Sequence, residues 1–351
     1  MKKKDISNVV ALTLIQGSNA LFPLFVFPYI FKFIGENNFS KIVTVEVVSF
    51  YLLSIVIYSF DVVGVRNVMS ALESGRDRVS REFSLILISR LFLWIIASST
   101  LLIFFYFFLN DLYFILIAWL FFPLGMILQS NYYFQAVERN FVFSVVIFLS
   151  RFFSCFLVFV IVKSEQEMLL AVYLVSMSYF FSGLMSLFYA ICFEKVRLSI
   201  PRMEELFSAL NSGKSIFWGN LSILLFRGSN VLILSLVTQN PAAVSYYSLA
   251  EKYTRMVQAV SRPLNQHFFP KAVSALRGIS DRLQQRKILW TNTKVQLAFI
   301  VLIVISFDTC VFIDTYYFHL FFTENIFFLL LILTIAPVFG IFNYMFVVAR
   351  W

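Results

Sequence analysis

The chain has 351 residues, of which 60% are hydrophobic and only 13% are charged, and its mean hydropathy is +0.84. A soluble globular domain is nearer about 45–50% apolar and about 25% charged, so this composition excludes a soluble enzyme with a polar surface on all sides. With 19% aromatic residues, the chain is predicted to be an integral membrane protein. The net charge is +9, but the basic residues lie in short segments beside apolar runs. We therefore attribute the charge to membrane topology and expect no nucleic-acid partner.

Ten apolar runs are each long enough to cross a bilayer as a helix, which takes roughly 20 residues. They are far too long for the strands of a membrane barrel, so the fold is predicted to be an all-α polytopic bundle. No gap between the runs could hold a separate soluble domain. The predicted helices cover residues 8–33, 42–63, 83–109, 112–135, 141–162, 169–193, 215–237, 243–268, 295–318 and 326–349.

Lys and Arg residues set the predicted orientation. With the N-terminus in the cytoplasm, 19 of the 28 fall on the cytoplasmic side and only Lys32, Lys41 and Lys163 on the outer side. Cytoplasmic loops of membrane proteins carry this excess of basic residues. The bias predicts cytoplasmic termini and an even helix count. The first apolar run is long enough to span and no small-residue cleavage site closes it, so we expect a retained helix rather than a signal peptide.

Six basic residues remain, and they lie inside the predicted helices. A charged side chain at the centre of a membrane helix costs roughly 2.5–3.5 kcal/mol, so each should face a partner or a wet cavity. Arg227 and Arg151 lie near mid-depth, whereas Arg90 is shallower and could snorkel. Ion pairs that clamp two helices are the structural alternative for all three. The six residues are Arg90, Arg151, Arg227, Lys252, Arg255 and Arg262.

The eighth predicted helix is the least apolar. Its Glu251, Lys252, Arg255 and Arg262 fall within roughly 100° of arc, and Glu251 and Arg255 form an i,i+4 pair. An amphipathic helix lying on the inner leaflet would leave an odd number of spans, so we favour a spanning helix that lines a cavity. A cationic cavity suits an anion, and the planar guanidinium of Arg suits phosphate in particular.

Acidic residues within the spans have two candidate roles. A buried carboxylate can carry a proton or bind Na⁺ for coupling to an ion gradient, or it can pair with one of the arginines. No other cofactor is expected. The candidates are Glu46, Asp61 and Glu251.

Polar groups and prolines also mark the first predicted helix. Gln16 and Asn19 place amides at mid-depth, and Pro23 and Pro28 predict either a hinge or a static bend. The tetrapeptide 16–19, Gln-Gly-Ser-Asn, is echoed by 227–230, Arg-Gly-Ser-Asn, at a similar depth in the seventh helix. This echo predicts two lobes, with six helices in residues 1–200 and four in residues 201–351.

The sequence offers no catalytic constellation. It has two His residues, three Cys residues inside apolar stretches and no phosphate-binding loop of the form GxxxxGK[ST]. These counts predict no zinc site, no disulfide framework and no nucleotide hydrolysis by this chain. We therefore expect a transporter rather than an enzyme.

Four segments resemble one known family. Residues 58–66, Tyr-Ser-Phe-Asp-Val-Val-Gly-Val-Arg, resemble the Tyr-Gly-Phe…Gly-x-Arg stretch of O-antigen flippases, which belong to the multidrug/oligosaccharidyl-lipid/polysaccharide exporter superfamily. Residues 129–139 resemble its Phe-Gln-Gly-x-Glu-Lys signature, with Ala136 in place of the glycine. The family's first helix is resembled by Asn8 together with residues 27–30. Its eighth-helix pattern is resembled by residues 247–252 together with Pro263 and residues 269–270.

The resemblance covers about residues 8–275 and implies a flippase of the bacterial inner membrane. Such a protein moves undecaprenyl-diphosphate-linked oligosaccharide from the cytoplasmic to the periplasmic leaflet by alternating access. Arg227, Lys252, Arg255 and Arg262 would bind the diphosphate or acidic sugars, and Gln16 and Asn19 the sugar hydroxyls. Arg90 and Arg151 would complete the positive lumen. Its partners would be membrane lipids, an O-antigen polymerase and a chain-length regulator.

Three alternatives stay open. A multidrug or cation antiporter shares the superfamily architecture but would favour an acidic lumen. A membrane-embedded polysaccharide polymerase would favour a large outer loop. A non-transporting scaffold is the structural alternative, because the family usually has twelve or more helices and the chain stops directly after a span. We expect the C-terminal lobe to lack its last helix pair or the sequence to be truncated.

Overall fold

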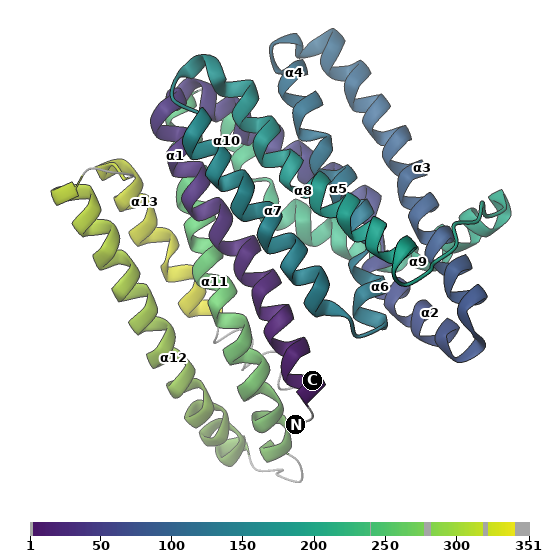
Figure 1. The fold of residues 1–351 in the computed structure, drawn as a ribbon. Helices are drawn as coiled ribbons and strands as arrows, with labels where there is room; N and C mark the ends of the chain where they lie inside the picture. The colour runs from purple at the N-terminus through teal and green to yellow at the C-terminus, as the bar shows by residue number, and fades with distance from the viewer. Residues whose placement is uncertain (1–2, 239, 277–281, 319–321, 341–351) are drawn as a thin grey trace. The chain divides into compact units, whose positions relative to one another are not determined.

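A computed structural model describes residues 3–238, 240–276, 282–318 and 322–340 (Figure 1). Every regular element in these ranges is helical, so the predicted all-α class is confirmed. The helices are α1 (Lys3–Ile57), α2 (Phe60–Ser74), α3 (Arg76–Phe108), α4 (Asn110–Trp119), α5 (Phe121–Gln129), α6 (Asn131–Ala136), α7 (Asn140–Ile161), η1 (Glu165–Glu167), α8 (Met168–Cys192), α9 (Met203–Gly228), α10 (Asn230–Thr238), α11 (Pro241–Leu276), α12 (Arg282–Ile313), η2 (Asp314–Phe318) and α13 (Glu324–Leu333).

Six of these helical stretches are long and apolar enough to cross a membrane, and a seventh qualifies if the bent pair α9–α10 is one span. Many of their large apolar side chains face outward, among them Phe107, Phe148 and Phe152, which are 71%, 45% and 64% exposed. An apolar surface of this kind is suited to lipid rather than water. The chain is therefore a multi-pass membrane protein.

Gly35 divides α1 into the first two predicted helices. Its φ of 76° and ψ of 168° are essentially restricted to glycine, and a Cβ there would meet the carboxylate of Glu165 at 3.4 Å. Gly75 has a similar conformation, φ 109° and ψ 169°, between α2 and α3. The two glycines thus allow sharp changes of chain direction, Gly35 within α1 and Gly75 between α2 and α3.

The chain divides into two compact units. Unit 1 comprises residues 1–22 and 33–245, and unit 2 comprises residues 23–32 and 246–351. The lobes predicted from the internal echo, 1–200 and 201–351, concern repeated helical units, which this division does not test. That boundary stays a prediction.

The core of unit 1 is built around α8, which packs against α5 and α7 (Figure 1). The buried positions of α8 are almost all small, namely Ala171, Val172, Val175, Ser176, Ser178, Ser182, Gly183, Ser186 and Ala190. Small residues let helix backbones approach closely inside a membrane, where apolar side chains gain little from leaving lipid. At the closest approach, Gly183 of α8 lies against the backbone oxygen of Gly125 in α5. The amide of Gln129 reinforces the contact by donating to the Ser182 hydroxyl at 2.7 Å.

Unit 2 packs residues 23–32 of α1 with α11, and α12 with η2 and α13. Tyr253 of α11 is 3% exposed, and its ring contacts Phe307 of α12 and Phe322, at centroid distances of 5.8 and 4.8 Å. Asp308 of α12 accepts a hydrogen bond from Thr334 at 3.3 Å. These contacts join α11 and α12 to residues 322–334 through aromatic and polar side chains.

Candidate functional site

Arg90 of α3 is almost fully buried, at 1% exposure. Its Nη2 donates to Oδ1 of Asp61 in α2 at 2.6 Å, and its guanidinium carbon lies 4.9 Å from the ring centroid of Tyr132 in α6. A carboxylate on one side and the negative face of a ring on the other both stabilise a cation that has left water. Arg90 therefore links α2, α3 and α6 of unit 1. This agrees with the structural alternative given for Arg90 from the sequence, an ion pair that clamps helices together.

The family-like segment 58–66 explains how Asp61 reaches this position. Tyr58 has a left-handed backbone, with φ 56°, at the junction of α1 and α2, and its ring stacks on Phe217 of α9 at 4.5 Å. Asp61 follows in the first turn of α2, where the helix dipole favours an acid. The turn and the ion pair together join α1, α2 and α3.

Arg151 is the second buried cation of unit 1. It lies midway along the apolar helix α7 and is 3% exposed. Its guanidinium carbon lies 3.4 Å from the ring centroid of Tyr179 in α8 and 5.4 Å from that of Phe22 in α1. Glu46, a candidate for ion coupling, is also buried, at 6% exposure. Aromatic rings stabilise a cation that has left water, and an Arg guanidinium stays charged in proteins, so Arg151 is a buried positive charge within the candidate span Asn140–Ile161.

Unit 2 carries the charges of α11. Arg255 forms the predicted i,i+4 ion pair with Glu251, at 3.0 Å, and the Arg255 side chain is 49% exposed. The Nζ atom of Lys252 lies 3.8 Å from the ring centroid of Phe27, in the stretch 23–32. The sequence placed Lys252 on a cavity-lining stripe but did not foresee the aromatic ring.

The prolines of the first helix also belong to unit 2. Pro28 has no backbone N–H, so the carbonyl of Leu24 lacks the donor that a helix normally supplies four residues later. The hydroxyl of Tyr253 donates to this carbonyl at 3.3 Å. A side chain of α11 thereby compensates for the proline in α1.

Four predicted site residues lie outside the side chains that the structure describes: Gln16, Asn19, Arg227 and Arg262. Among the described side chains, the structure joins Arg90 to Asp61 and Arg255 to Glu251. It also shows no group of three or more His, Cys, Asp or Glu residues in the described part that could hold a metal.

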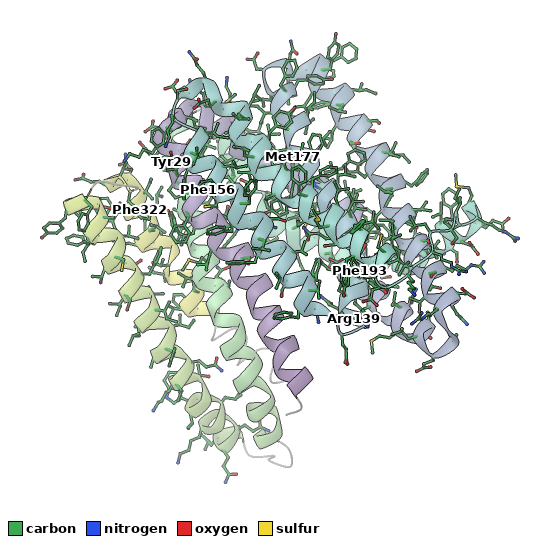
Figure 2. All side chains as sticks on the ribbon, viewed as in Figure 1. Tyr29, Arg139, Phe156, Met177, Phe193 and Phe322 are labelled. Carbon is green, nitrogen blue, oxygen red and sulfur yellow. The ribbon has the colours of Figure 1, made fainter. Side chains whose placement is uncertain are left out.

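A cavity that the sequence did not predict lies at one end of unit 1, where α6 ends and the segment after α8 begins. Figure 2 shows Arg139 and Phe193 at this end. Arg139 donates to Glu194 at 2.5 Å. A hydrogen bond with the Tyr189 side chain and the charge of Glu194 raise the pKa of Arg139, so it stays charged. From the sequence, the basic residues of this cavity were interpreted only as loop residues that determine the membrane topology.

Residues 6–274 match the model of the family described as "Polysaccharide biosynthesis protein". The chain belongs to this family. The match includes Arg90, Arg151, Lys252, Arg255 and the four segments that resemble O-antigen flippases. The resemblance found from sequence motifs is therefore confirmed at the level of the family.

Two similar proteins carry the name "Putative O-antigen transporter". The one from Escherichia coli (strain K12) is 26% identical over 279 residues, which are 77% of this chain and 65% of the relative. The one from Shigella dysenteriae is 22% identical over 272 residues, 77% of this chain and 68% of the relative. The chain thus spans about two thirds of the length of these two relatives. No solved structure matches it.

Proposed function

We propose that this protein exports O-antigen, by flipping undecaprenyl-diphosphate-linked oligosaccharide from the cytoplasmic to the periplasmic leaflet of the bacterial inner membrane. The observation that carries the proposal is membership of the polysaccharide biosynthesis family, together with two relatives named for O-antigen transport. The multi-pass helical fold supports a role inside the membrane.

The cations inside the helices fit such a substrate. A diphosphate is strongly anionic, and an Arg side chain can hold it with two parallel charge-assisted hydrogen bonds. Arg151 keeps a positive charge at membrane depth in unit 1, and Lys252 and Arg255 bring positive charge to α11 in unit 2. A cation antiporter would need the opposite sign of charge, so these residues favour the flippase over the antiporter.

In this mechanism, Arg227 and Arg262 join Lys252 and Arg255 in binding the diphosphate or acidic sugars. Gln16 and Asn19 hydrogen-bond sugar hydroxyls, and Arg151 keeps the path positive. Arg90, held in an ion pair by Asp61, positions the helices beside the path. Glu46, Asp61 and Glu251 are the candidates for coupling to an H⁺ or Na⁺ gradient. An O-antigen polymerase and a chain-length regulator would act on the exported units.

The test is to delete the gene in its host and separate the lipopolysaccharide on a gel. Complementation uses the wild type, Arg151→Gln, Arg151→Lys, Arg227→Ala and the control Arg78→Gln. We expect the O-antigen ladder to vanish on deletion and to return with the wild type, the control and, in part, Arg151→Lys. Arg151→Gln and Arg227→Ala should fail at normal expression, because each removes a positive charge from the path.

A ladder that persists after deletion, in a strain without a second exporter, would contradict export by this protein. If deletion instead raised sensitivity to cationic drugs, the antiporter would replace the flippase. If the ladder were lost on deletion but restored by Arg151→Gln and Arg227→Ala, export would stand and the cationic path would not.

A further inference from the structure

The cavity at the end of unit 1 measures about 400 Å³ and combines three stretches that are distant in sequence. They are the end of α2 with the first turns of α3, the end of α6 with the turn after it, and the segment that follows α8 (Figure 1). Three cationic and two acidic side chains line it: Arg76, Arg139, Lys195, Glu138 and Glu194. Three positive and two negative charges leave a net charge of +1.

The charged side chains of the cavity differ in whether they form ion pairs. Arg139 is held by Glu194 at 2.5 Å. Arg76 and Lys195 are exposed, and neither forms an ion pair with another residue that the structure describes. Arg76 is also the first residue of α3, where the helix dipole and unpaired N–H groups favour an anion. The two uncommitted cations are therefore the ones positioned for an anionic ligand.

The cavity is built by specific backbone contacts. Ser80 and Ser84 of α3 are buried and bind the segment after α8, since the N–H groups of Arg197 and Ser199 donate to their hydroxyls at 3.1 and 3.0 Å. Two lining residues, Glu138 and Lys195, have left-handed backbones with φ of 54° and 57°. Such conformations are costly for residues other than glycine and cluster at functional sites.

We propose that this cavity binds the phosphate of a lipid headgroup. The volume of the cavity suits a headgroup rather than a whole oligosaccharide. The cavity also lies where membrane-spanning helices end, and basic pockets in this position bind anionic lipids. Residues 133 and 136–139, from the family-like signature segment, form part of its lining. The phosphate comes from a bilayer lipid or from a polyprenyl diphosphate, which share this chemistry. The inference does not depend on export.

The test measures lipid binding to the purified full chain by native mass spectrometry. The probes are dioleoylphosphatidylglycerol, farnesyl diphosphate and, as the uncharged reference, dioleoylphosphatidylcholine. The variants are Arg76→Gln and Lys195→Gln, with Arg76→Lys as the conservative change. The control Arg78→Gln removes the same charge two residues away, from a neighbouring cavity that Arg78 lines.

We expect Arg76→Gln and Lys195→Gln each to weaken binding of a phosphate probe on the order of tenfold, the typical effect of losing one charge-assisted hydrogen bond. Arg76→Lys should keep most of the affinity, and Arg78→Gln should change it less than about twofold. The probe that responds identifies the source of the phosphate. If Arg76→Gln does not fold, Lys195→Gln still tests the site, because Lys195 is an exposed loop side chain.

The proposal is overturned if neither phosphate probe binds better than dioleoylphosphatidylcholine. It is also overturned if Arg78→Gln weakens binding as much as the two cavity variants, since the effect would then be one of general surface charge. Because the assay involves no transport, either result leaves the export proposal to its own test.

Discussion

Pro28 lies within α1, and the Leu24 carbonyl four residues before it cannot find its usual helical donor. The sequence predicted a hinge or a static bend from this proline. In the structure, the Tyr253 hydroxyl donates to that carbonyl, while the Tyr253 ring packs between Phe307 and Phe322. The proline thus creates a binding position for a side chain of α11 inside unit 2.

We predict that Tyr253→Phe lowers the stability of the protein by about 1 kcal/mol, the usual net value of one hydrogen bond. The ring contacts would remain, and only the hydroxyl would be lost. The loss should shrink in a Pro28→Ala background, because alanine restores the N–H that the Leu24 carbonyl lacks. The measurement is the unfolding midpoint in detergent for the two single variants and the double variant.

Tyr317→Phe serves as the control, since Tyr317 is 74% exposed and should lose its hydroxyl without effect. Equal losses from Tyr253→Phe with and without Pro28 would show that the hydroxyl does not act through the Leu24 carbonyl.

The partners of the buried charges show what single residues in the sequence can and cannot predict. A charge inside a membrane helix must be stabilised, so the sequence alone identifies Arg90 and Arg151 as residues that need partners. The i,i+4 pair of Glu251 and Arg255 could be named outright, because helix geometry alone brings the two together. Asp61 as the partner of Arg90, and Tyr179 under Arg151, depend on how distant helices pack, which local spacing does not encode.

The described helices α5 and α8 pack backbone against backbone at Gly125 and Gly183. A Cβ on Gly183 would overlap the Gly125 carbonyl oxygen, and a Cβ on Gly125 would overlap the backbone of Tyr179 and Phe180. The obstacles are backbone atoms, which cannot rotate away. Side chains at these two positions would therefore force the helices apart.

We predict that Gly183→Val destabilises the protein by about 3 kcal/mol or more, because backbone must move to admit the side chain. Gly219→Ala in α9 is the matched control, since nothing lies within 4 Å of the added Cβ. Alanine there should be neutral or slightly stabilising, as it is better suited to a helix than glycine. The measurements are the yield of monodisperse protein and its melting temperature. A normal melting temperature for Gly183→Val would rule out this close contact.

The existence of the helices was easier to predict than their breaks. Each of the ten predicted ranges overlaps a described helix, because long apolar runs determine membrane helices. The breaks were missed where no apolar run ends. The range 112–135 is divided into α4, α5 and α6, with the last break at Ser130, whose φ is 49°. The range 42–63 runs past the end of α1 at Ile57 into α2. These breaks follow from packing rather than from hydropathy.

At the scale of the whole molecule, the distribution of Lys and Arg residues along the sequence predicts which end of the protein faces the cytoplasm. Arg76, Arg139 and Lys195 were assigned to the cytoplasmic side from three separate loops. The structure brings all three to one cavity at one end of unit 1. They therefore share a side of the membrane, as that assignment requires, but which side it is remains a prediction.

We predict that this end of unit 1 faces the cytoplasm and that the loop between α7 and α8 faces the periplasm. Single cysteines would be introduced as Arg78→Cys and Ser164→Cys, both at exposed positions, after the three native cysteines have been replaced by serine. In intact spheroplasts, a membrane-impermeant maleimide should label Ser164→Cys and spare Arg78→Cys. In permeabilised spheroplasts the maleimide should label both cysteines, which shows that each thiol is reactive.

The reverse labelling pattern would invert the topology and place the proposed phosphate cavity at the outer surface, where it could bind only lipids of the periplasmic leaflet. Labelling of both sites in intact spheroplasts would mean that α7 and the helices beside it do not separate the two ends, which contradicts the spanning assignment itself.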